Sequence, residues 1–155
     1  MAYEYIKAGQ QDWLQKLNET LTSVDIYHKH FDGTLLNGAT GWGSADIWYN
    51  QSFFVASYNG WIVVPGSGPF IDFMDNPLSS IVDFKQVTSF NRYIPMQAQK
   101  NVAVGKAART FINVGVDNGG ALSGWYSDGQ TFDTTANYGF TLHLPFFGSR
   151  SSMKI

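Results

Sequence analysis

The stretch that decides the predicted fold is Ser52–Pro65, SFFVASYNGWIVVP. Two apolar runs flank Asn59-Gly60, and this dipeptide favours a two-residue type I′ hairpin turn, because both central residues of that turn need φ > 0. We therefore expect a hairpin in which Tyr58 faces Trp61. Side chains alternate across a strand, yet both faces of this segment are apolar. Such a hairpin is expected to be covered from both sides, either within the domain or by another subunit.

The composition favours a single β-rich domain. A chain of 155 residues is long enough to bury a sizeable core. Charged residues make up 14%, well below the usual share of about 25%, while aromatic residues reach 16% and glycines number 16. Short runs of β-favouring residues alternate with turn signals along most of the chain. The sequence therefore predicts a mainly β fold, an antiparallel β-sandwich or jelly-roll-like barrel, with one N-terminal amphipathic α-helix.

Charge and cysteine content exclude several classes of function. The net charge is −2 and the ten Lys and Arg residues are scattered, so neither nucleic acid nor a membrane surface is expected as a partner. The absence of Cys excludes disulfides, zinc–thiolate sites and cysteine nucleophiles. The N-terminus has no apolar signal core, and no apolar stretch approaches the ~18 residues of a membrane span. We expect synthesis in the cytoplasm without membrane insertion.

An apolar stripe marks residues 10–24 as the predicted helix. The stripe follows the a/d spacing of a coiled coil and consists of Leu14, Leu17, Leu21 and Val24. One interpretation packs this helix on its own domain, and the other makes it a self-associating stem with the stripe as the oligomer interface. The Gly-rich stretch NGATGWG then separates an N-terminal oligomerisation element, residues 1–37, from a β-rich head, residues 38–155.

The segment His28-Lys29-His30-Phe31-Asp32 is the candidate metal site. Alternate residues of a strand share a face, so His28, His30 and Asp32 are expected to converge. Imidazole and carboxylate ligands suit zinc, iron or nickel. One strand supplies too few ligands, but three copies around a trimer axis would supply an octahedral set for a structural metal ion. The alternative is a pair of solvated histidines, and a motif this short is more often that than a metal site. No other cofactor is predicted.

Aromatic residues near turns form the candidate saccharide site. A shallow saccharide site needs an exposed ring that stacks on the sugar, beside short polar side chains that bind its hydroxyls. Trp42 and Trp125 lie in Gly-containing segments and are expected to be exposed, although most Trp side chains belong to the core. The predicted carbohydrate-binding residues are Trp42, Trp125, Tyr126, Asp117, Asn118 and Asp128.

The sequence offers little for catalysis. It contains no G-x-S-x-G nucleophile elbow and no phosphate-binding loop. A glycoside hydrolase needs two carboxyl groups around the scissile bond, whereas Asp117 and Asp128 sit in turn-forming dipeptides that already explain them. We therefore predict a protein that is not an enzyme. The alternatives are a monomeric β-sandwich carbohydrate-binding module, a polysaccharide-degrading enzyme using Asp117, Asp128 or Asp133, and a cytosolic small-ligand β-barrel.

The organisation of the whole chain resembles baseplate and receptor-binding tail proteins of tailed phages that infect Gram-positive bacteria. The resemblance rests on QQDWLQKLNETLTSV, LLNGATGWG, FFVASYNGWIVVPG and YGFTLHLPFFG. It implies a homotrimer in the virion, anchored to other tail proteins by its N-terminus, with a β head that binds cell-wall saccharide during host adsorption. The His-x-His pair is similar to metal-binding pairs on the trimer axis of some phage spikes.

Overall fold

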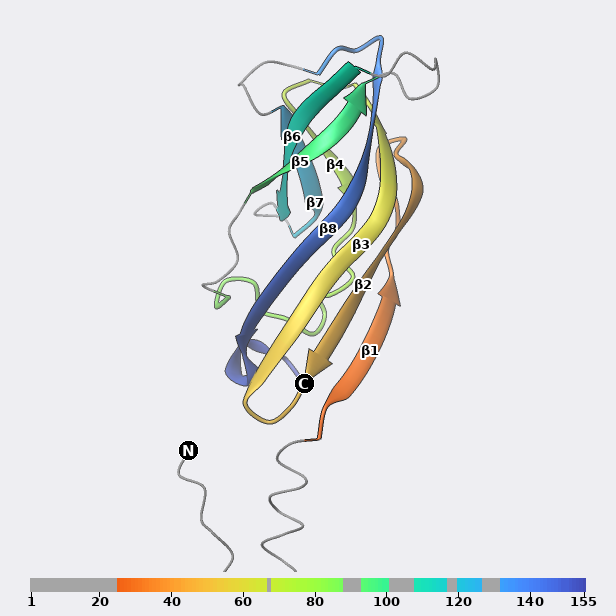
Figure 1. The fold of residues 1–155 in the computed structure, drawn as a ribbon. Coiled ribbons are helices and arrows are strands. Elements are labelled where there is room, and N and C mark those ends of the chain that lie inside the picture. The colour runs from red at the N-terminus through yellow and green to blue at the C-terminus, as the bar shows by residue number, and fades with distance from the viewer. Residues whose placement is uncertain (1–24, 67, 88–92, 101–107, 117–119, 127–131) are drawn as a thin grey trace, which may run out of the picture.

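The computed structural model describes residues 25–66, 68–87, 93–100, 108–116, 120–126 and 132–155. In this part of the chain, eight strands form one antiparallel sheet in the order β1-β2-β3-β8-β5-β6-β7-β4 (Figure 1). The elements are β1 Tyr27–Asp32, β2 Thr40–Tyr49, β3 Phe53–Pro65, β4 Phe70–Met74, β5 Ile94–Lys100, β6 Ala108–Val116, β7 Leu122–Tyr126, β8 Asn137–Ser149 and the short 3₁₀ helix η2 Arg150–Ser152.

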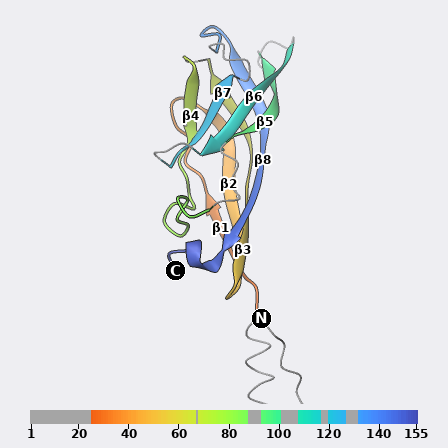
Figure 2. The same cartoon turned by 90° about the vertical axis from the view of Figure 1, so that its left-hand side faces the viewer.

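The prediction of a mainly β, antiparallel fold is confirmed. The sheet curls, so that in Figures 1 and 2 the strands β4 to β7 stand over one end of the long strands β2, β3 and β8. The helix predicted over residues 10–24 and its apolar stripe lie outside the described residues. β1 belongs to the predicted N-terminal element, residues 1–37, yet it pairs with β2 along its whole length. The described end of that element is therefore a strand of the same sheet.

The predicted hairpin at Asn59-Gly60 is wrong, because β3 runs as one continuous strand of 13 residues through both positions. β3 is paired on both sides, with β2 from Phe54 to Val63 and with β8 from Phe53 to Pro65. This pairing requires an extended backbone at Asn59 and Gly60, where a turn would break both ladders. Glycine serves another purpose at position 60: a Cβ atom there would lie 2.3 Å from the carbonyl oxygen of Trp42. The glycine permits close approach of two backbones.

The two apolar sides of β3 differ in burial. On the inner side, Phe54, Tyr58 and Ile62 are fully buried and belong to the hydrophobic core. On the outer side, Phe53 and Val55 stay exposed in the single chain. Within the chain, the expected cover is present on the inner side only, and cover of the outer side by another subunit stays a prediction. Alternation along a strand explains the difference, because odd-numbered and even-numbered residues of β3 face opposite ways.

The inner face away from β4 to β7 is covered by residues 75–87 and by the C-terminus. Backbone hydrogen bonds join the two segments, with Asp83 N donating to Ser152 O over 2.8 Å and Lys154 N to Ile81 O over 2.8 Å. The Tyr58 hydroxyl donates to Asn76 Oδ1 across 2.5 Å and so ties the core of β3 to this cover. These contacts close the core and leave the outer face as the exposed side of β3.

The segment after β1 connects the two ends of the curled sheet. Leu36 N donates to Phe73 O and Asp75 N donates to Thr34 O, both over 2.9 Å, around a β-bridge between Leu35 and Met74. These bonds occupy the edge of β4 that would otherwise be open. The chain that leaves β1 is held there against β4. No helix in the described part of the chain is long and apolar enough to span a membrane.

Gly60→Ala tests the close approach of β2 and β3. The added methyl group would meet the Trp42 carbonyl oxygen and, at 2.9 Å, the Gly43 Cα atom, both of which are backbone. We expect a loss of about 1–3 kcal/mol in the free energy of unfolding, measured as a lower urea midpoint at unchanged m value. The control is Gly124→Ala, where the nearest atoms lie at 3.9 Å. Its effect should be about 0.5 kcal/mol or less. Equal stability of both variants would contradict the packing described.

Candidate functional site

The outer face of β1, β2, β3 and β8 carries polar side chains in two adjacent cross-strand rows. Continuous register across the strands places His30 opposite Asp46 and Asp46 opposite Ser57. The neighbouring row lies two residues further along each strand. Directly opposed side chains in a sheet are close enough to interact. We call this set the polar stripe: His30, Asp46 and Ser57 in one row, and Asp32, Ser44, Asn59 and His143 in the next.

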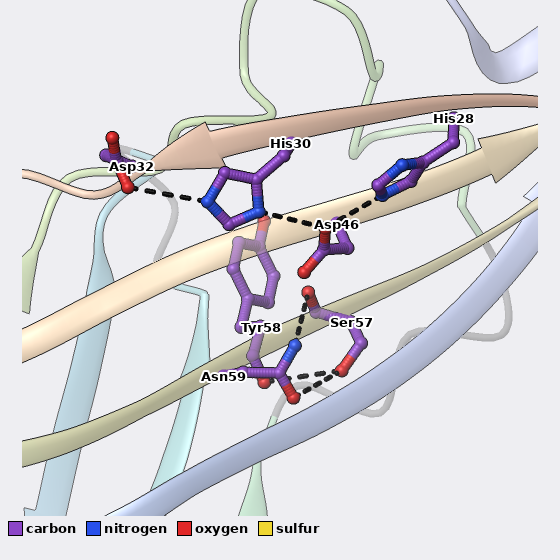
Figure 3. A network of polar contacts seen from close by, with 7 residues as sticks. All are labelled: His28, His30, Asp32, Asp46, Ser57, Tyr58 and Asn59. Carbon is purple, nitrogen blue, oxygen red and sulfur yellow. Dashed lines mark hydrogen bonds and ion pairs between the residues drawn. The ribbon is translucent and has the colours of Figure 1, made fainter.

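Asp46 is the centre of the polar contacts between β1 and β2 (Figure 3). Its Oδ1 atom lies 2.8 Å from His28 Nε2 and 2.9 Å from His30 Nδ1, so both imidazole N–H groups donate to one carboxylate oxygen. The other ring nitrogen of His30 is 3.4 Å from Asp32 Oδ1. In the second row, Asn59 Oδ1 accepts from the Ser57 hydroxyl at 3.0 Å and contacts His143 Nδ1 at 3.1 Å. The contacts thus form two groups, one between β1 and β2 around Asp46 and one between β3 and β8 around Asn59.

The network favours the charged forms of His30 and Asp46. The hydrogen bond to Asp46 is the main reason that the pKa of His30 is raised from 6.5, and contact with Asp32 adds to it. Burial acts to raise the pKa of the Asp46 carboxyl, but hydrogen bonds from His30 and His28 outweigh burial and lower that pKa from 3.8. His30 therefore adds stability at pH below about 6.5 and loses it as the pH rises through its folded pKa. Asp46 adds stability above about pH 3.8, and this contribution is lost as the pH falls through the pKa of its carboxyl in the folded protein.

Aromatic side chains border the stripe on both sides. On one side Trp48, which is 39% exposed, stacks on the His28 ring at 4.8 Å between centroids and 16° between planes. The same row continues across the sheet to Val55 and the exposed Phe147. On the other side Trp42, which is 58% exposed, lies opposite Trp61. The face therefore has a polar middle between two aromatic borders.

The structure separates the predicted saccharide-binding residues. Trp42 is exposed, as expected, and borders the polar stripe. Trp125 lies in β7 rather than in a loop, half-buried against Tyr93 at 4.3 Å and Phe70 at 6.2 Å between ring centroids. β2 and β7 are not neighbours in the sheet. Tyr126 ends β7, and the remaining predicted ligands, Asp117, Asn118 and Asp128, lie outside the described residues. Trp42 and Trp125 thus belong to different surfaces.

The two predicted metal ligands lie together, but a different carboxylate joins them. His28 and His30 share a face of β1, as alternation requires, and both contact Asp46 of β2, whereas Asp32 reaches only His30. Within the described residues, no group of three or more His, Cys, Asp or Glu side chains is arranged to hold a metal ion. The metal on a trimer axis requires further chains and stays a prediction. So does the interface at Leu14, Leu17, Leu21 and Val24, outside the described residues.

Sequence reasoning missed Asp46, Trp48, Asn59 and His143 as members of one face. Alternation within β2 gives part of the signal, since Trp42, Ser44, Asp46 and Trp48 recur with period two. The register between strands far apart in the chain supplies the rest. The chain has no match among protein-family models, curated proteins or solved structures.

Asp46→Asn tests the electrostatics of the network. The neutral amide removes the larger of the two attractions on the His30 imidazolium, so the pKa of His30 should fall towards 6.5. The measurement is an NMR titration of the His30 ring. Asp32→Asn is the matched control, and it should lower that pKa by less, because its contact is longer and is a smaller cause of the shift. Equal shifts in the two variants would contradict the central place given to Asp46.

Proposed function

We propose that this protein binds saccharide without chemical conversion, using the outer face of β1, β2, β3 and β8. The observation that carries the proposal is the polar stripe bordered on the same strand by two exposed tryptophans, Trp42 and Trp48. Saccharides present apolar C–H faces and hydroxyl edges. Exposed indole rings suit the first, while the carboxylate, amide and imidazole groups of the stripe suit the second.

Preorganisation supports the proposal. The side chains that would receive sugar hydroxyls are held by one another: Asp46 by the two histidines, and Asn59 by Ser57 and His143. They stand on long strands that are each paired with neighbours, and not on loops. Polar groups fixed before binding lose less conformational freedom when the ligand arrives. A face of this kind can give a weak but specific site.

We also propose that the chain is a homotrimeric component of a phage tail, with the curled sheet as its sandwich-like or jelly-roll-like head. The support is the organisational resemblance and the apolar stripe of residues 10–24. Such an assembly would make weak sites effective, because several sites on one particle bind a repetitive cell surface by avidity. A solution mass near three times 17.2 kDa, by light scattering coupled to size exclusion, tests the trimer. A mass of 17.2 kDa would favour the monomeric binding module.

The enzymatic alternative finds little support at Asp133. Lys100 Nζ lies 2.8 Å from Asp133 Oδ2, and this ion pair, with further hydrogen bonds from Thr135, holds the pKa of the Asp133 carboxyl well below its ordinary value. A catalytic acid in a glycosidase needs a raised pKa, so that it is protonated when the sugar binds. Asp117 and Asp128 lie outside the described residues. Release of reducing ends from wall polysaccharide is the assay that would reveal such an enzyme.

Trp42→Ala tests saccharide binding by this face. Removal of an exposed ring that stacks on sugar should weaken binding to Gram-positive wall polysaccharide about tenfold or more, equal to about 1.4 kcal/mol, by isothermal titration calorimetry. The matched control is Phe111→Ala, which removes a similarly exposed ring from β6, outside the proposed face.

Three results would speak against the proposal. Unchanged binding by the Trp42 variant would move the site elsewhere on the protein. An equal loss with Phe111→Ala would indicate a nonspecific effect of removing surface aromatics. Absence of binding by the parent protein at high concentration would remove receptor binding and leave a purely structural role.

A further inference from the structure

The outer face of β1, β2, β3 and β8 carries acidic groups but no permanent cation. All residues of these four strands are described, and none of their outward positions is Lys or Arg. Lys29 points to the opposite side of β1, where its ammonium group lies 6.0 Å from the centroid of the Tyr49 ring. Arg150 stacks on the same ring at 5.6 Å. The acidic groups are Asp46 at the centre of the stripe and Asp32, whose side chain is 96% exposed.

This charge distribution selects among glycans. The stripe holds the carboxylates of Asp32 and Asp46 and no Lys or Arg, so a glycan rich in phosphate or uronate groups meets like charge. Hydroxyl and ammonium groups of a ligand are donors, and they meet acceptors. Both histidine contacts to Asp46 use Oδ1, which leaves Oδ2 as an acceptor for a ligand. The stripe suits sugars that are neutral or carry amines.

The separation of the two exposed tryptophans sets a minimum length for the ligand. Trp48 and Trp42 face the same side of β2, with Asp46 and Ser44 between them. At about 3.3 Å per residue their Cα atoms are about 20 Å apart along the strand. This span is too long for one sugar ring to contact both tryptophans. A ligand that uses both borders of the stripe must be a chain of several sugars that runs along β2.

Building on the proposed function, we infer that the ligand is an uncharged or amine-bearing oligosaccharide aligned with β2. One sugar stacks on Trp48, another stacks on Trp42, and the sugars between them donate to the polar stripe. A monosaccharide fills only one border, and a polyanionic glycan is repelled by Asp32 and Asp46. The binding face thereby sets the direction, the minimum length and the charge class of its ligand.

The test is a glycan panel at about pH 8, where an imidazole carries less positive charge than at neutral pH. The panel holds linear hexose, N-acetylhexosamine, hexosamine and hexuronate chains from one sugar to about six sugars long. We expect the full-length protein to bind at least one neutral or amine-bearing series, with affinity rising at least tenfold from the monosaccharide to chains that reach both tryptophans. The hexuronate chains should bind at least tenfold more weakly than that series.

Substitution of each tryptophan tests the two ends of the proposed site separately. Trp42→Ala and Trp48→Ala should each reduce affinity for the long chain about tenfold or more, while each variant keeps the weak affinity for a short fragment at the other end. Trp48→Phe, which retains a ring over His28, should recover part of the loss. Phe111→Ala, on β6, should leave both affinities unchanged.

The outcomes separate the inference from the proposed function. Binding that is independent of chain length, or strongest for hexuronates, overturns the inference and leaves saccharide binding intact. Binding that depends on only one of the two tryptophans also overturns it. No binding to any series, nor to wall polysaccharide, removes the proposed function and the inference with it.

Discussion

The double-sided pairing of β3 is the constraint on which the rest of the structure depends. Every residue from Phe54 to Val63 has a partner on β2 and another on β8, and at Gly60 the backbone of β2 comes close enough to exclude any side chain. This central strand fixes which side chains face the core and which face outwards. A slip by one residue would bury Ser57 and Asn59 and expose Phe54 and Tyr58. The position of the polar stripe is therefore a consequence of core packing.

The same register gives the outer face its chemical character. Inward positions of β2, β3 and β8 are almost entirely apolar, as a core requires, whereas their outward positions combine aromatic and short polar residues. Asp46 joins the polar side chains of β2 to those of β1, because it accepts from two histidines of this edge strand. The edge strand is itself held in place where the segment after it joins β4. Core, sheet closure and surface network are thus mechanically connected.

The sequence predicts the fold class well and the site only in part. Composition and short runs of β-favouring residues between turn signals favour an antiparallel β protein, and the structure has one. The hairpin predicted at Asn59-Gly60 is wrong because turn propensity is a local signal, whereas the pairing on both sides of β3 is long-range. His28 and His30 were correctly placed on one face, since that follows from alternation alone. Asp46 was missed because the pairing of β1 with β2 cannot be derived from local pattern. Trp125 was expected to be exposed because of its Gly-containing context, whereas in β7 it is half-buried against Tyr93.

NMR of the indole N–H groups tests the central claim most directly, since the protein has five tryptophans and each gives its own signal. A bound neutral oligosaccharide should shift the signals of Trp42 and Trp48, which border the polar stripe. The signal of Trp125, on β7, should stay in place. This result would locate saccharide binding on the outer face of β2. A shift confined to Trp125, or equal small shifts of all five signals, would contradict the account.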